Sequence, residues 1–129
     1  MKYLLDTCIL IDLLKGKPGL QDKIMEVGID KCFVADIILA ELFVGPYKTD
    51  NALMHRQAEW IEREFRCVCF GSSYRTFGKI RAQLEKKGTK LDSMDLLIAS
   101  IAIDNDLTLV TRNANHFSRI PGLRLETWA

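Results

Sequence analysis

Four oxygen-bearing side chains follow or interrupt apolar segments of this sequence, in places where they could share one chemistry. Asp6 follows the apolar run at residues 3–5, and Glu41 interrupts the apolar stretch at residues 37–43. Asp95 lies near the start of a third apolar stretch, and Asn113 comes just after another, at residues 107–111. Carboxylates that share a cleft repel each other unless a cation lies between them, and hard oxygen ligands select Mg²⁺ or Mn²⁺. The combination predicts a divalent metal site.

Each of these residues also has a structural interpretation. Asp6 could cap the helix that follows it. Asp95 could form an approximate capping box with Asp92 in the first turn of its helix. Glu41 could pair with a buried arginine, and Asn113 is a common turn residue. Taken singly, these interpretations compete with metal binding, and only the combination favours a metal.

Neighbouring polar residues are auxiliary candidates. Thr7 and Thr111 could orient a ligand or a water molecule, or could serve only as helix or turn caps. Arg112 precedes Asn113 and could clamp a phosphate, although exposed arginines are common at strand ends.

The cysteines do not indicate zinc. The sequence has four cysteines and two histidines, namely Cys8, Cys32, Cys67, Cys69, His55 and His116. Cys67 and Cys69 form a C-x-C pair rather than C-x-x-C, and residues 66–70 predict a short strand with both thiols on one face. Because the histidines are isolated in sequence, we expect reduced, structural cysteines.

The elements that must position these residues alternate between strands and helices. The pattern predicts strands at residues 2–5, 32–35, 67–70, 107–111 and 123–125. It predicts helices at residues 7–15, 20–27, 37–44, from 49 or 50 through 65, from 72 or 73 to 87, and 92–104, with Gly45-Pro46 ending the third. Alternation of this kind indicates an α/β/α sandwich with a central, mostly parallel sheet. In such sheets ligands gather beyond the carboxyl ends of the strands.

Length and composition bound the protein class. A chain of 129 residues fits a single domain over residues 1–129, and 48% hydrophobic residues can form a core. The net charge of +1 neither supports nor excludes nucleic acid as a partner. The longest uncharged apolar run, residues 96–103, is less than half of the roughly 20 residues that cross a bilayer. We therefore expect a soluble, cytoplasmic protein.

Four blocks of sequence carry a family resemblance. They are residues 3–10 (YLLDTCIL), 35–42 (ADIILAEL) with Gly45, 95–99 (DLLIA) and 110–117 (VTRNANHF), and the similarity continues through residues 120–128 (IPGLRLETW). In order and spacing these blocks resemble PIN-domain ribonucleases, specifically the VapC-type toxins of toxin–antitoxin pairs. The resemblance implies a PIN-like fold over the whole chain and RNA hydrolysis assisted by Mg²⁺ or Mn²⁺.

The resemblance also implies roles for individual residues. It places metal-ligand and catalytic roles on Asp6, Glu41 and Asp95, any of which could take the proton of the attacking water. A fourth ligand position falls on Asn113, where many relatives have Asp, so the number of metal ions stays open. Asp92 lies where relatives vary and is auxiliary.

The resemblance implies three partners as well. The first is structured RNA such as transfer RNA, and the second is a VapB-like antitoxin whose basic, helical segment enters the acidic cleft between residues 20–27 and 53–65. The third is a second copy of the chain, because the segment with Trp60, Ile61 and Phe65 is more apolar than a small monomer easily buries. Basic candidates for RNA binding, which also fit an ordinary solvated helix face, are Arg75, Lys79, Arg81, Lys86, Lys87 and Lys90.

Two alternatives come from other functional classes. The chain could be a metal-free protein-interaction domain in which the acids serve as caps and ion pairs. It could also be a haloacid dehalogenase-like phosphohydrolase with Asp6 as nucleophile, but Cys8 stands where those enzymes have a second Asp.

Overall fold

The computed structural model describes residues 1–128, which form a five-stranded sheet covered by helices on both faces. The strand order is β3-β2-β1-β4-β5, and all four neighbouring pairs are parallel. The strands are β1 (Tyr3–Leu5), β2 (Cys32–Ala35), β3 (Arg66–Val68), β4 (Thr108–Val110) and β5 (Leu125–Glu126). The prediction of a three-layer sandwich with a central parallel sheet is confirmed.

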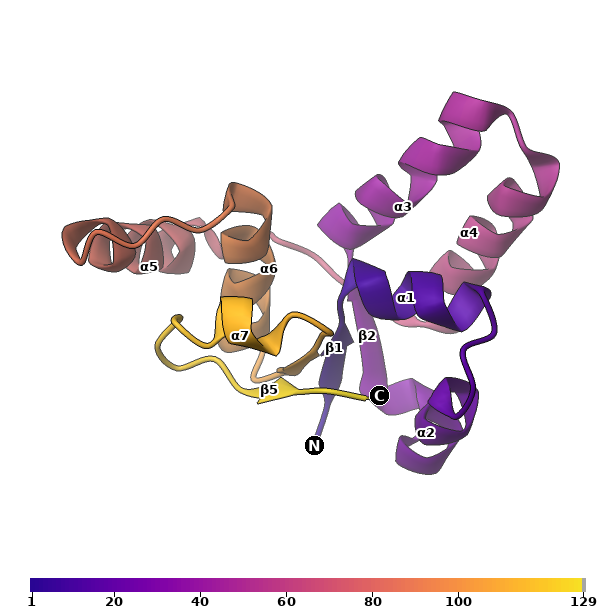
Figure 1. Cartoon of the computed structure of the whole chain (residues 1–129), viewed down its shortest axis with the longest axis horizontal. Coiled ribbons are helices and arrows are strands. Elements are labelled where there is room, and N and C mark those ends of the chain that lie inside the picture. The colour runs from indigo at the N-terminus through magenta and orange to yellow at the C-terminus, as the bar shows by residue number, and fades with distance from the viewer. Residues whose placement is uncertain (129) are drawn as a thin grey trace.

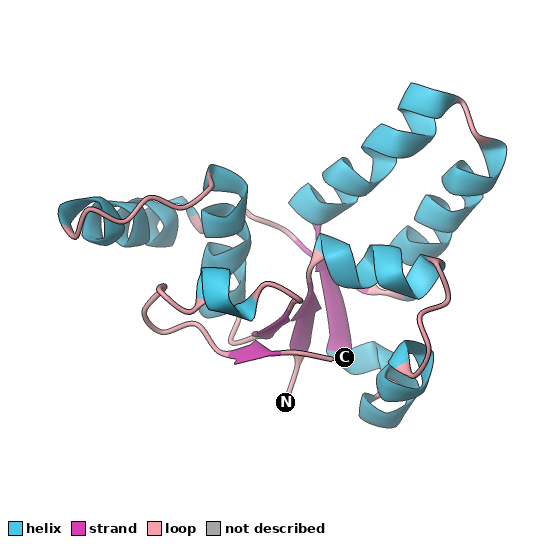
Figure 2. Cartoon of the chain, viewed as in Figure 1, coloured by secondary structure: helices cyan, strands magenta, loops and turns pink. Residues whose placement is uncertain are grey.

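The helices divide between the two faces according to the direction in which the chain moves across the sheet. The helices are α1 (Thr7–Leu14), α2 (Leu20–Val27), α3 (Asp36–Thr49), α4 (Ala52–Glu64), α5 (Tyr74–Lys86), α6 (Ser93–Asp104) and α7 (Ala114–Phe117), with a 3₁₀ turn at Ile29–Lys31. Figure 1 shows α1–α4 on one side of the sheet and α5–α7 on the other, and Figure 2 shows the helical layers flanking the strands. The chain passes from β1 to β2 and β3 in one direction, then returns to β4 and β5 in the other, so right-handed crossovers place α1–α4 on one face and α5–α7 on the opposite face.

The core lies between the central strands and the helices that cover them. Leu4, Val34 and Leu109, from β1, β2 and β4, are fully buried. Helix α6 buries six of its residues, from Leu96 to Ala102, and this explains why its sequence is apolar all round. Within residues 1–128, no helix combines the length and the apolar character needed to cross a membrane.

Several element boundaries follow from local sequence chemistry. The bounds of α2 and β2 agree with the prediction. Helix α5 ends beside Gly88, which adopts a left-handed φ of +72° and donates its N–H to the Glu85 carbonyl, while Thr89 donates to Leu84. This arrangement satisfies carbonyls at the helix end that would otherwise lack donors.

The prediction that Gly45-Pro46 ends the third helix is wrong. Helix α3 continues through Pro46 to Thr49. Pro46 and Leu42 are buried, and a methyl group added at Gly45 would lie only 2.9 Å from the Met54 Cε atom of α4. Close packing of α4 against this side of α3 therefore outweighs the cost of an interior proline.

The remaining differences concern short elements. The strand predicted at 67–70 lies at Arg66–Val68, and the strand predicted at 123–125 lies at Leu125–Glu126. The one-turn helix α7 was not predicted from the sequence. It is too short for a periodic apolar pattern and is fixed by burial of Phe117.

Candidate active site

Asp6 is the most constrained residue of the site, which lies at the carboxyl ends of β1 and β4. Leu5 pairs with Val110 in the sheet, so Asp6 and Thr111 leave adjacent strands side by side. Asp6 is only 7% exposed, and its Oδ2 accepts a 2.7 Å hydrogen bond from Thr111 Oγ1. Its Oδ1 accepts a 2.8 Å bond from the Thr7 backbone N–H at the start of α1. Both carboxylate oxygens therefore have donors, and the side chain is held in one orientation.

Thr7 joins Asp6 to Glu41. The Thr7 hydroxyl donates to Glu41 Oε1 at 3.1 Å, while the Thr7 N–H binds Asp6. Glu41 lies on α3 and is exposed, so the alternative that it pairs with a buried arginine is wrong. Thr7 therefore contacts both carboxylates, one through its backbone N–H and the other through its hydroxyl.

Asp95 completes the set from the first turn of α6. Its Oδ2 lies 2.7 Å from His116 Nε2 of α7, and its side chain is 23% exposed. Burial raises the pKa of Asp95, the negative charges of Asp6 and Asp92 raise it further, and His116 opposes these effects. The charge coupling places Asp6, Asp92 and Asp95 in one electrostatic environment.

The capping-box interpretation of Asp92 and Asp95 is wrong. Asp92 occupies the N-cap position of α6 but makes no side-chain capping hydrogen bond, and Asp95 contacts His116 instead. Asn113 likewise makes no side-chain cap to α7, and its backbone N–H donates to Thr111 Oγ1 at 3.1 Å. The exposed Asp92 and Asn113 side chains therefore border the site without being used in helix capping.

Two site neighbours were missed from the sequence. In the sequence His116 is isolated, and Cys8 fits a purely structural role. Cys8 Sγ lies 3.7 Å from Asp6 Oδ2 and 3.8 Å from Thr111 Oγ1, so this thiol borders the site. The only sequence signal for His116 is its place in the block at residues 110–117, one helical turn after Asn113.

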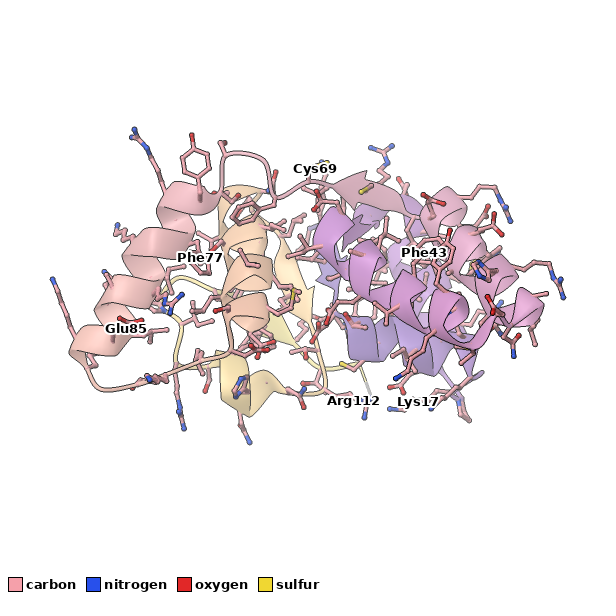
Figure 3. The ribbon with its side chains drawn as sticks, turned by 90° about the horizontal axis from the view of Figure 1, so that it is seen from above. Lys17, Phe43, Cys69, Phe77, Glu85 and Arg112 are labelled. Carbon is pink, nitrogen blue, oxygen red and sulfur yellow. The ribbon has the colours of Figure 1, made fainter. Side chains whose placement is uncertain are left out.

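Arg112 lies at the rim of the site in an ion pair. Its Nε is 2.9 Å from Asp12 Oδ2 on α1, and Lys17 Nζ is 3.6 Å from the same oxygen. Figure 3 shows Arg112 and Lys17 near each other, away from Glu85 on α5. The basic residues of α5 are exposed, and Arg81 pairs with Glu85 at 2.8 Å, as on an ordinary solvated helix face.

The donor set fits a hard divalent cation that keeps part of its hydration shell. Among residues 1–128, no three His, Cys, Asp or Glu side chains lie close enough to enclose a metal ion directly. Mg²⁺ commonly binds through one or two carboxylates and retains several waters, so direct contact with every acid is not required. The oxygens of Asp6, Glu41 and Asp95, with Asn113 at the border, suit such an ion.

An apolar groove adjoins the carboxylates. It has a volume of about 400 Å³ and lies between α1, α3 and α4, where Thr7 and Glu41 form its polar end and Ile11, Pro46 and Met54 line its apolar part. The α4 wall agrees with the sequence-based expectation. Residues 20–27, the other expected wall, do not line this groove, whose remaining walls are α1 and α3.

Comparisons with known proteins cover the whole chain. The family described as PIN domain matches residues 3–123. Ribonuclease VapC2 from Rickettsia felis is 33% identical over 99% of this chain and 98% of its own length. The tRNA(fMet)-specific endonuclease VapC of Salmonella typhimurium is 32% identical, over 99% of this chain and 98% of its own.

Solved structures give the same result. The structure of VapBC2 from Rickettsia felis bound to a promoter DNA fragment matches with a TM-score of 0.92 and 31% identity over 100% of both chains. The DNA-bound VapBC of Salmonella typhimurium matches with a TM-score of 0.87 and 30% identity over 100% of this chain and 99% of that one. The similarity therefore extends well beyond the site.

The raised pKa of Asp95 makes a prediction for stability. Because the ionised carboxylate is disfavoured in the folded protein, Asp95→Asn should melt at the same or a higher temperature than wild type at pH 7 without metal. On acidification the folded wild type takes up a proton before the unfolded chain does, so this difference should shrink. Thermal unfolding between pH 7 and about 4 measures it. Asp22→Asn on α2 is the control, and a pH-independent loss of stability in Asp95→Asn would contradict the interpretation.

Proposed function

The chain belongs to the PIN-domain family and is a ribonuclease toxin of the VapC type, and from this premise we propose that Asp6, Glu41 and Asp95 hydrolyse RNA with a bound divalent metal ion. The observation that carries the proposal is the coupling of three carboxylates from three elements. Thr7 bridges Asp6 and Glu41, and the charge of Asp6 acts on Asp95. Family membership argues against the metal-free interaction domain and the dehalogenase-like phosphohydrolase.

In the proposed mechanism some side chains bind the metal ion and others orient the metal ligands. Asp6, Glu41 and Asp95 would hold Mg²⁺ or Mn²⁺, directly or through water, with Asn113 as the fourth oxygen donor. When bound, the ion lowers the pKa of a water molecule and neutralises charge on the phosphoryl oxygens. The Thr111 hydroxyl orients Asp6 by donating to Oδ2, and the Thr7 hydroxyl orients Glu41 by donating to Oε1.

Structured RNA such as transfer RNA is the proposed substrate. The Salmonella typhimurium and Shigella flexneri relatives are described as tRNA(fMet)-specific, at 32% and 30% identity. On this chain, Arg112 is half exposed beside Asn113, and its pairing with Asp12 fixes its guanidinium at the rim. Arg112 is therefore our candidate for contacting a substrate phosphate. The free thiols of the exposed Cys67 and Cys69 fit the cytoplasm, where RNA is found.

Substitution of the acids tests the metal-dependent activity. Asp6→Asn, Glu41→Gln and Asp95→Asn should each lower RNA cleavage in Mn²⁺ by about 100-fold or more, since each removes an anionic ligand worth several kcal/mol in the transition state. Circular dichroism should show folded protein. Cleavage of a labelled transfer RNA with Mn²⁺ or with EDTA is the measurement, and Asp22→Asn is the control. Full activity of a variant would remove that residue from the catalytic set.

We also propose an antitoxin of the VapB kind as the inhibitor. The matched structures include VapBC complexes. The groove between α1, α3 and α4 suits the apolar face of a helical segment, and an Arg or Lys on that segment would reach Glu41 and Asp6 from the polar end. A guanidinium satisfies clustered carboxylates with paired hydrogen bonds, so inhibition requires no change of fold.

A charge placed in the groove tests this docking mode. Met54→Glu should weaken antitoxin binding by about tenfold or more, because a carboxylate would have to be buried against the partner's apolar face. Calorimetry with the cognate antitoxin gives the affinity. Met25→Glu is the matched control, since Met25 on α2 is 69% exposed and outside the groove. Equal affinities of the two variants, with no relief of inhibition by Mn²⁺, would place the inhibitor elsewhere.

We propose that the chain forms a homodimer through the α3–α4 hairpin. Of the apolar residues expected at the interface, Ile61 and Phe65 are buried in the chain's own core, and only Trp60 is partly exposed. The hairpin instead exposes Val44, Tyr47 and Leu53, at 60%, 70% and 55%. A patch of this kind favours association.

A pair of tyrosine variants tests the dimer. Tyr47→Lys should convert the protein to monomer at micromolar concentration, because it places a charge in the apolar interface. Tyr74→Lys, on α5 and 61% exposed, should leave the dimer intact. Sedimentation velocity distinguishes the two species, and a monomeric wild type would overturn the proposal.

A further inference from the structure

One short segment contacts two of the three carboxylates. After β4, Thr111 Oγ1 donates to Asp6 Oδ2 at 2.7 Å, and five residues later His116 Nε2 lies 2.7 Å from Asp95 Oδ2. The segment is itself anchored, because the His116 N–H donates to the Asn113 carbonyl at 2.9 Å and Phe117 is 1% exposed. Its two contacts are therefore made by one rigid unit.

Without the His116 contact, charge repulsion would favour rotation of the Asp95 side chain away from the site. Asp95 shares its surroundings with the negative charges of Asp6 and Asp92, and its side chain is 23% exposed, which leaves it a route toward solvent. A hydrogen bond from Nε2 requires that this nitrogen carry a proton, whether the ring is neutral or charged. His116 therefore donates to Asp95 Oδ2 as the imidazolium or as the neutral tautomer that carries its proton on Nε2.

The imidazole also contacts an aromatic ring. Its ring packs edge-on against the neighbouring Phe117, with centroids 5.9 Å apart and an interplanar angle of 85°. Phe117 belongs to the core, so the ring orientation is tied to the packing of α7.

We propose that His116 is a positioning residue that fixes the orientation of the Asp95 carboxylate, so that the metal-binding oxygens are arranged before the ion arrives. The inference rests on the proposed function, since it assumes that Asp95 binds the metal. Groups that orient a metal ligand commonly change metal affinity by about 10- to 100-fold when they are removed. In this proposal His116 donates one hydrogen bond to Asp95 and does not contact RNA.

Two substitutions distinguish the hydrogen bond that His116 donates from the space that its side chain fills. His116→Leu removes the donor, whereas His116→Gln places an amide N–H near the position of Nε2. His116→Leu should bind Mn²⁺ about 10- to 100-fold more weakly than wild type, and His116→Gln should recover most of the loss. Calorimetric titration of the RNA-free protein with Mn²⁺ measures this affinity, and RNA cleavage is followed in parallel. Thermal unfolding without metal checks each variant, and if His116→Leu does not fold, the shorter His116→Asn takes its place.

Each outcome bears on the proposal. Loss of Mn²⁺ affinity in His116→Leu with recovery in His116→Gln supports it. Unchanged Mn²⁺ affinity in both variants with poor cleavage would assign His116 to the RNA instead, and equal loss in both would mean that the imidazole does more than donate one bond. Either result overturns the proposal. Asp95→Asn identifies failure of the premise, because Mn²⁺ binding as tight as that of wild type would show that Asp95 does not bind the metal.

Discussion

The site depends on how a nearly buried charge, Asp6, is satisfied. A carboxylate that is 7% exposed is tolerated only when donors replace the water that it has lost. Here the donors come from the backbone at the start of α1 and from Thr111 at the end of β4. The second donor is in place because β1 and β4 pair in the register that sets Leu5 against Val110. The pairing of β1 with β4 therefore fixes the position of Thr111 relative to Asp6. Asn113 and His116 lie on the segment that begins at Thr111.

The other constraint is repulsion among acids, and it acts against stability. The raised pKa of Asp95 reports that its ionised form is disfavoured by burial and by Asp6 and Asp92. The fully buried residues of the central strands and of α6 provide the core that tolerates such a cluster. Any ligand that brings positive charge relieves the repulsion and stabilises the folded form. A metal ion and a partner's guanidinium both do so, and both require the same oxygens, so the proposed cofactor and inhibitor oppose each other.

The sequence predicts element boundaries well where the local residues favour only one conformation. The apolar run before Asp6, the loop before Leu20 and the glycine after α5 correctly predicted where elements begin or end. Pro46 led to a wrong prediction of where α3 ends. Packing of α3 against α4 outweighs the local preference of proline, and no local sequence pattern reveals this packing. His116 was missed for a related reason. Its partner Asp95 lies on another helix, and only the return of the chain through β4 brings the two together. Each acid alone also fits a structural role, so grouping Asp6, Glu41 and Asp95 depended on their combination and was strengthened by the family resemblance.

The groove and the site share residues, and this has a consequence for control. Thr7 and Glu41 line the polar end of the groove, while Thr7 also donates to Asp6. A helix packed along Ile11, Pro46 and Met54 would therefore bring its polar end against the bridge that joins two of the carboxylates. Apolar burial along the groove would supply affinity, and a single basic side chain at that end would supply inhibition. Because the two contributions come from different parts of one segment, loss of the basic residue should leave a partner that still binds but no longer blocks the acids.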